Sequence, residues 1–132
     1  MAKKNLPRPT ELELQMLKVL WDTSPLTARQ IRESLAERGR ELAHTSVITT
    51  LQKMVNKQQL KQLDPVEGKA YRFSPRVTAD NVSQSMLGDL VDRVFYGSQE
   101  AVMLSLIDAA DLDAESLKRL RKAFNQKMKE KQ

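Results

Sequence analysis

The sequence contains no cysteine and a single histidine, His44. The missing thiols exclude disulfide bonds, thiolate metal sites and a cysteine nucleophile, and one histidine cannot build a multi-histidine metal site. The chain also has no glycine-rich phosphate loop, no serine–histidine–aspartate order and no carboxylate pair in an apolar setting. We therefore expect no metal, no cofactor, no catalytic residue and no enzyme activity.

Turn-forming and aromatic residues are also scarce, with 4 glycines, 5 prolines, 1 tryptophan, 2 tyrosines and 3 phenylalanines in 132 residues. This scarcity argues against a turn-rich all-β fold and favours a mainly helical one. No apolar run approaches the ~18 residues of a membrane helix. The basic residues among positions 1–9 are not followed by the apolar segment of a secretory signal. We expect a cytoplasmic protein without membrane insertion.

The net charge of +5 is unevenly distributed. Residues 1–76 hold 14 Lys and Arg against 8 Asp and Glu, a net charge of +6, whereas residues 77–132 hold 8 against 9, a net charge of −1. Such asymmetry is typical of a front half that faces a polyanion and a back half with another role, although a chance distribution of solvated charges is the alternative. The break at Ser74-Pro75 predicts two domains, 1–76 and 77–132.

The first part follows the pattern of a winged helix-turn-helix. Two capping boxes predict helices over 11–23 and 28–38, and an apolar stripe at helical spacing predicts a third over 44–58. Five β-branched residues in that third segment would also suit a strand, but the spacing and the length favour a helix. Alternating runs at 60–63 and 70–73 around a Pro- and Gly-containing loop predict a small β-hairpin wing.

The second part predicts three more helices, over 79–95, 99–107 and 114–130, started by Thr78, Ser98 and Asp113. A segment of this size rarely forms a sufficient core alone, and these helices carry more apolar positions than it can hide. We therefore interpret the part as a dimerisation domain that buries seven residues against a second copy: Met86, Leu90, Val94, Leu104, Leu117, Leu120 and Phe124.

The outward face of the third helix is polar, small and rich in hydroxyl groups, which allows close approach to the major groove of DNA. Gln52 can pair with adenine and Lys53 with guanine or phosphate. We predict DNA contacts from this helix and from basic residues of the hairpin: His44, Thr45, Ser46, Thr49, Gln52, Lys53, Asn56, Lys57, Lys61, Lys69 and Arg72. The alternatives are a solvated helix face without a ligand, a structural role for His44, and a basic hairpin that only protects a sheet edge.

Several segments resemble one known family in order and spacing. They are ELQMLKVLW at 13–21, LAHTSVITTLQKMV at 42–55 and FYGS at 95–98, together with Tyr71 and Asp111-Leu112. Over about residues 8–130 the chain resembles the penicillinase repressor family of bacterial winged-helix regulators, which includes methicillin-resistance and copper-transport repressors. The resemblance implies a homodimeric repressor that binds a palindromic operator through residues 44–58, with the wing at 64–69 on the DNA backbone.

The resemblance also implies a mode of release. Family members are typically inactivated by proteolysis in the dimerisation domain after a membrane sensor protease detects antibiotic, and the matching bond is Ser105-Leu106. The best-known cleavage pair is Asn-Phe, and this chain has Ser-Leu at that bond. The copper-responsive branch uses a cysteine-rich tail, which a chain without cysteine lacks. Gln58-Gln59 replaces the usual Lys-Gly, so the helix must end without glycine.

We therefore expect a dimeric, DNA-binding transcriptional repressor. Two other functions are compatible with the same fold. A winged-helix regulator could respond to a small ligand bound in a dimer cleft, and a winged-helix interaction module could bind a protein instead of an operator.

Overall fold

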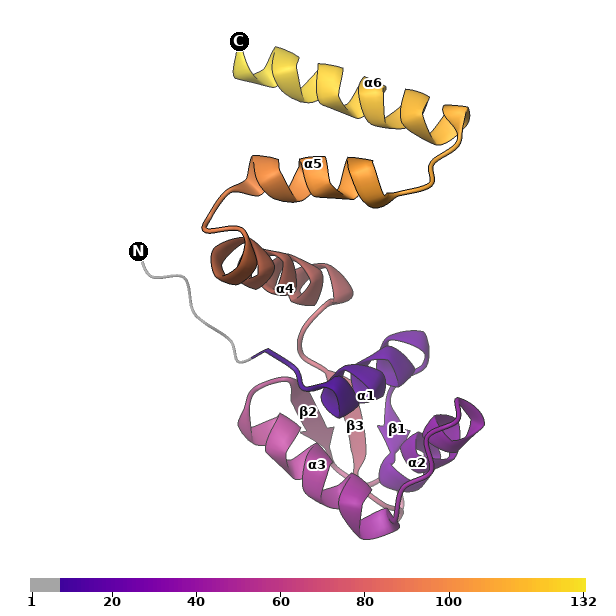
Figure 1. Cartoon of the computed structure of the whole chain (residues 1–132). Coiled ribbons are helices and arrows are strands. Elements are labelled where there is room, and N and C mark those ends of the chain that lie inside the picture. Colours follow the sequence, from indigo (N-terminus) through magenta and orange to yellow (C-terminus); the bar gives the residue numbers. More distant parts are fainter. Residues whose placement is uncertain (1–7) are drawn as a thin grey trace. The chain divides into compact units, whose positions relative to one another are not determined.

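We describe a computed structural model of the chain, which places residues 8–132 (Figure 1). Within this range it contains six helices and three short strands, which confirms the predicted mainly α, winged-helix class. The prediction that residues 1–9 form no secretory signal falls largely outside the described residues. The elements are α1 (Glu11–Asp22), β1 (Leu26–Thr27), α2 (Ala28–Glu37), α3 (His44–Asn56), β2 (Leu60–Leu63), β3 (Arg72–Pro75), α4 (Ala79–Val94), α5 (Gln99–Ala109) and α6 (Ala114–Lys131).

Both predicted capping boxes are confirmed. At α1 the Glu13 amide donates to Thr10 Oγ1 over 3.2 Å, and the Thr10 amide donates to Glu13 Oε1 over 3.0 Å. At α2 Thr27 and Gln30 exchange the equivalent bonds of 3.2 and 2.9 Å. These reciprocal bonds satisfy amides that a helix start otherwise leaves without partners, which explains why both helices begin where the sequence predicts. The predicted N-cap bonds of the last three helices are also present, from Thr78, Ser98 and Asp113.

Helices α2 and α3 end in the same backbone motif, although one has glycine and the other does not. After α2, Gly39 adopts a φ of +90°, and Arg40 donates its amide to the Leu35 carbonyl over 2.8 Å. After α3, Gln58 adopts a φ of +68°, and the next amide, that of Gln59, donates to the Met54 carbonyl over 2.9 Å. Both ends are therefore Schellman turns with a left-handed residue.

The three strands form an antiparallel sheet in the order β1-β3-β2, in which Phe73 lies opposite both Leu26 and Gln62. The prediction of a strand at 70–73 was wrong by two residues, since β3 begins at Arg72. The buried Phe73 sets the register because its side chain must face the core. Tyr71 lies before β3 in the wing loop and is half exposed.

The wing loop turns between Val66 and Lys69, and the Lys69 amide donates to the Val66 carbonyl over 3.1 Å. Its two central residues, Glu67 and Gly68, have φ values of +53° and +74°. Positive φ at both central positions is what a type I′ hairpin turn requires, and Lys69 follows directly after it.

One hydrophobic core joins the winged-helix elements to the first half of α4. The Trp21 indole packs at its edge and donates Nε1–H to the Val77 carbonyl over 2.9 Å, which fixes the segment that leads into α4. Every element from α1 to α4 except β1 supplies at least one of the buried side chains: Met16, Leu17, Val19, Leu20, Ala28, Ile31, Leu35, Val47, Leu51, Met54, Leu60, Phe73 and Val82.

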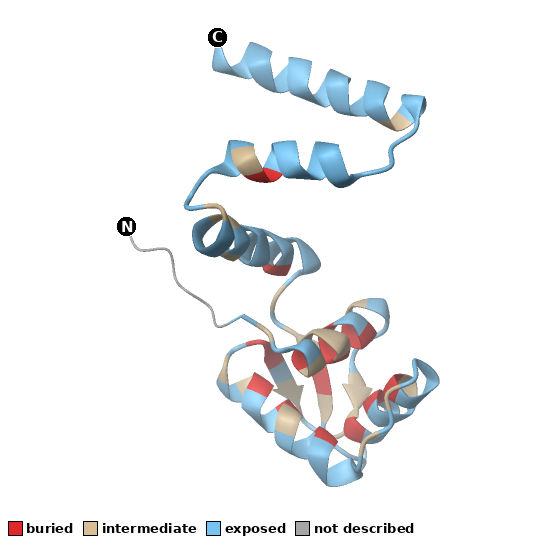
Figure 2. Cartoon of the chain, viewed as in Figure 1, coloured by how far each residue is buried: buried red, intermediate tan, exposed pale blue. Residues whose placement is uncertain are grey.

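The chain divides into two compact units, the first ending at Asp89 and the second running from Leu90 to Gln132. Burial differs sharply between them (Figure 2). The first unit holds the core, whereas Val102 is the one buried hydrophobic side chain among the described residues of the second. Because Val82 belongs to the core of the first unit, a truncation that preserves this core must lie beyond it; the predicted domain boundary at residue 76 stays a prediction.

Candidate nucleic-acid interface

Helix α3 packs one face into the core and presents the other to solvent. Val47, Leu51 and Met54 are fully buried, at the spacing of a single helical stripe. Seven of the predicted DNA contacts lie on this 13-residue helix, and all seven are exposed: His44, Thr45, Ser46, Thr49, Gln52, Lys53 and Asn56. Small hydroxyl side chains at the amino end leave room for the helix to approach a surface closely.

The start of α3 has no side-chain cap in the described structure. Its N-cap is Ala43, and no side chain accepts the first-turn amides there. His44 follows the cap residue and is exposed, so it neither caps α3 nor packs in the core. Uncapped amides at the positive end of a helix dipole attract anions such as phosphate groups.

The carboxyl half of α3 is held against the sheet. Gln52 Nε2 lies 3.4 Å from Gln62 Oε1 on β2, and this weak hydrogen bond restrains the amide that could pair with adenine. Gln62 lies opposite the buried Phe73 in the sheet, so the strand that restrains Gln52 is itself held by the core.

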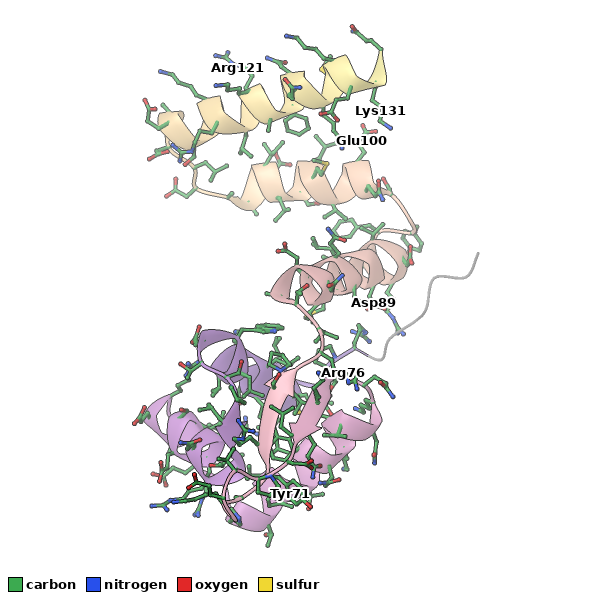
Figure 3. All side chains as sticks on the ribbon, turned by 180° about the vertical axis from the view of Figure 1, so that it is seen from behind. Tyr71, Arg76, Asp89, Glu100, Arg121 and Lys131 are labelled. Atoms are coloured by element: carbon green, nitrogen blue, oxygen red, sulfur yellow. The ribbon has the colours of Figure 1, made fainter. Side chains whose placement is uncertain are left out.

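The basic residues of the wing occupy different environments. Lys61 on β2 and Lys69 after the turn are exposed, so their ammonium groups can reach phosphates. Arg72 is half buried, and its Nη2 donates to the Asp64 carbonyl over 3.2 Å, so this side chain supports the wing backbone. Figure 3 shows Tyr71 at the wing end of β3 and Arg76 beyond its other end.

Lys57 differs from the other predicted DNA contacts because its ammonium group is engaged inside the first unit. Its Nζ lies 2.8 Å from Glu13 Oε2 of α1, and the Glu13 side chain is only 3% exposed. Burial raises the pKa of Glu13, but hydrogen bonds from Lys57, the Thr10 amide and Gln59, with the charge of Lys57, outweigh it and lower that pKa below its ordinary value of 4.5. The pair joins the start of α1 to the end of α3.

Two arginines that were not among the predicted DNA contacts lie beside the amino end of α3. Arg29 and Arg32 of α2 line a shallow depression together with His44, Glu33 and Glu41, and Arg29 Nε lies 3.2 Å from Glu33 Oε2. The Nε of Arg32 donates to the Leu42 carbonyl over 2.8 Å, which fixes the connector between the two helices. Their spacing on the outer face of α2 was visible in the sequence, but only the packing of α2 beside α3 shows that they share a surface with His44.

The described residues contain no group of three or more His, Asp or Glu side chains that could hold a metal ion, and no helix among them is long and apolar enough to cross a membrane. The polar face of α3, the wing and the basic first unit are the arrangement of a winged-helix DNA-binding protein. The family described as penicillinase repressor matches residues 9–126. The chain belongs to the penicillinase repressor family.

Curated relatives agree with this membership. The transcriptional regulator BlaI of Mycobacterium tuberculosis (strain ATCC 25618 / H37Rv) is 33% identical over 122 residues, which cover 90% of this chain and 85% of that protein. The penicillinase repressor of Bacillus licheniformis is 20% identical over 117 residues, which cover 89% of each chain. This family member is therefore a transcriptional repressor and not an enzyme, as the sequence predicts.

Proposed function

We propose that the protein represses transcription as a homodimer bound to a palindromic operator, with α3 of each copy in the major groove and each wing on the DNA backbone. The observation that carries this proposal is the outer face of α3, where seven exposed polar side chains stand on a helix that the core holds rigidly. A surface helix without a ligand would favour Glu, Lys and Ala for their helix propensity, and this face has few of them.

Phosphate contact would come from the exposed cations around α3. Lys53 lies on α3, and Lys61 and Lys69 flank the wing loop, so positive charge borders the reading face on two sides. Arg32 would add a contact at the amino end of α3, whereas the charge of Arg29 is paired with Glu33 on the same helix. Lys57 would contribute through the packing of α3, because its charge is paired with Glu13.

The case for a second copy of the chain rests first on apolar exposure. All seven predicted dimerisation residues are among the exposed large hydrophobic side chains, with Leu120 and Phe124 each 42% exposed. Exposed large apolar side chains in this number on a single chain are typical of a protein interface. A two-fold dimer would cover the same surface on both copies and present two α3 helices at half-sites about one helical turn of DNA apart, or a multiple of that distance.

The charge distribution also favours a second copy as the partner that covers these apolar side chains. Residues 80–115 hold eight Asp and Glu against one Arg, whereas residues 118–131 hold seven Lys and Arg against one Glu. Arg121 and Lys131 project from α6 in Figure 3. A partner with the same two segments offers a basic helix to the acidic region and an acidic region to the basic helix.

Release would follow from a signal that separates the two copies, and proteolysis by a membrane sensor protease is the form that we propose. Ser105 and Leu106 are exposed, but their peptide bond lies inside α5, which continues for three more residues to Ala109. Proteases bind substrates as extended strands, so α5 must unwind locally before this bond can be cut. A repressor that acts on chromosomal DNA would be cytoplasmic.

The experiment that tests this function is selection of bound fragments from genomic DNA, followed by gel shifts of the recovered sites. We expect one palindromic sequence to be enriched, and its affinity to fall by orders of magnitude between roughly 50 and 200 mM salt, as for proteins that make ~6–10 phosphate contacts. The absence of any enriched sequence, or affinity that does not change with salt, would contradict the proposal.

A further inference from the structure

Ile48 is the one apolar side chain of α3 that the core does not use. Val47, Leu51 and Met54 are buried, and Val55 packs against the same core from its edge. Ile48 is 37% exposed and is not among the side chains packed on that core. More than a third of this isoleucine is therefore open to solvent on a helix whose other apolar side chains serve the core.

The neighbours of Ile48 on the helix surface are the polar residues of the reading face. Thr45 lies three residues before Ile48 and Gln52 lies four residues after it. Thr49 lies four residues after Thr45 and three before Gln52, and all three polar residues are exposed. Residues at these spacings are adjacent on a helix. The four side chains therefore form one exposed strip along α3, with an aliphatic group between a hydroxyl and an amide.

An aliphatic group in such a strip has one natural partner in the major groove of DNA. Thymine presents a 5-methyl group there, and no other standard base does, so an apolar side chain distinguishes thymine from the other three bases. A β-branched residue in a helix keeps essentially one χ1 rotamer, so the Cγ2 methyl group of Ile48 is already fixed in direction before binding. The amide of Gln52 beside it suits adenine, which would place both contacts in an A·T-containing stretch.

We infer that Ile48 is a specificity-determining residue that contacts the 5-methyl group of one thymine in each operator half-site. The inference rests on the proposed function, since it requires α3 to lie in the major groove. It goes beyond that function because it assigns a base to a side chain that carries no hydrogen-bonding group.

The test replaces single thymines of the selected operator with deoxyuridine, which lacks only the 5-methyl group. For the unaltered protein, one position in each half-site should lower affinity about three- to fivefold, the effect of one buried methyl group. In Ile48→Ala the same replacement should change affinity less than about 1.5-fold. Thr45→Ser and Thr49→Ser are matched controls, because each removes a methyl group from the same strip and should keep the sensitivity at that position.

Ile48→Ala should fold normally, because the side chain is outside the core, and Ile48→Val provides a second, milder variant that should keep most of the sensitivity. The inference is overturned if the operator has no thymine in its half-sites, if no deoxyuridine replacement weakens binding, or if Ile48→Ala keeps the sensitivity. These outcomes all occur with a protein that binds its operator. A protein that selects no DNA sequence at all would overturn the proposed function, and this inference with it.

Discussion

Gln58 occupies a backbone conformation that glycine adopts far more easily. A left-handed φ brings the Cβ of any other residue too close to the backbone, at a cost of ~1–2 kcal/mol. Glycine avoids this cost but loses more chain entropy on folding, which offsets part of its advantage. Gln58 holds this conformation because the turn lets the last carbonyls of α3, those of Met54 and Val55, accept hydrogen bonds from the amides of Gln59 and Gln58. The residue therefore stores strain at the carboxyl end of the reading helix.

Gln58→Gly should stabilise the protein by about 1 kcal/mol, measured by urea unfolding. The matched control is Gly39→Ala at the same position of α2, where an added Cβ meets nothing within 4 Å. Because space is free there, any loss of stability measures the cost of the φ of +90° alone. We expect Gly39→Ala to destabilise the protein by about 1 kcal/mol. An unchanged or lowered stability of Gln58→Gly would show that the Gln58 side chain contributes more than its backbone loses.

Glu13 and Lys57 form a pair whose loss should destabilise the first unit. Glu13→Gln leaves the half-buried ammonium of Lys57 without its charge partner, and we expect unfolding free energy to fall by about 1–3 kcal/mol. Lys57→Met with Glu13→Gln should recover part of that loss, because the double variant buries no unpaired charge. Urea unfolding of the two single variants and the double variant measures the coupling.

The same pair makes stability depend on pH. Since the pKa of Glu13 is lowered in the folded state, its contribution is complete above the ordinary value of 4.5 and is lost as the pH falls through the folded-state pKa. Glu13→Gln should therefore flatten the stability curve below about pH 4.5. An acid limb as steep as that of the unaltered protein would show that other carboxylates dominate it.

At the scale of elements, α3 and the wing should differ in what they contribute to binding. Gln52→Ala should relax base preference at one position in each half-site, at a cost of ~1–3 kcal/mol for the preferred base. Lys69→Ala should weaken all sequences about equally and reduce the dependence on salt. Affinities for a library of operator variants measure both effects, and the opposite pattern would mean that the wing reads the sequence.

Helices were predicted well because their signals are local. Thr10 and Thr27 mark helix starts through residues three positions away, and every predicted helix is present within two residues of its predicted ends. The stripe of Val47, Leu51 and Met54 identified α3 in spite of its β-branched residues. Local hydrogen bonds and a helical stripe are both visible in a single sequence.

Features that depend on distant residues were not predicted. The register of β3 follows from Phe73 meeting Leu26, and the ion pair joins residues 13 and 57, which no local pattern connects. Lys57 was consequently assigned to DNA contact on charge alone. Ile48 fell outside the predicted site because apolar residues in an amphipathic helix are ordinarily assigned to the core, and only its exposure separates it from that set.

At the scale of the whole molecule, the apolar surfaces of α4 to α6 predict that dimerisation and operator affinity are lost together. Leu120→Asp places a charge on an apolar stripe of α6 and should convert the dimer into a monomer with much weaker operator binding. Gln126→Asp, on the exposed polar side of the same helix, adds the same charge without removing a basic residue and should change the assembly far less. Sedimentation at micromolar concentration distinguishes the two, and a monomeric unaltered protein that still binds the palindrome tightly would contradict the account.

The near absence of a core beyond Leu90 also affects how repression responds to the amount of protein in a cell. If this part of the chain is fully folded only when paired, the active species forms from two copies, and below its dissociation constant its concentration varies with the square of the total. Halving the concentration of chains would then leave a quarter of the dimers. Repression would fall more steeply than protein content, so a modest rate of destruction would be enough to switch the regulated genes on.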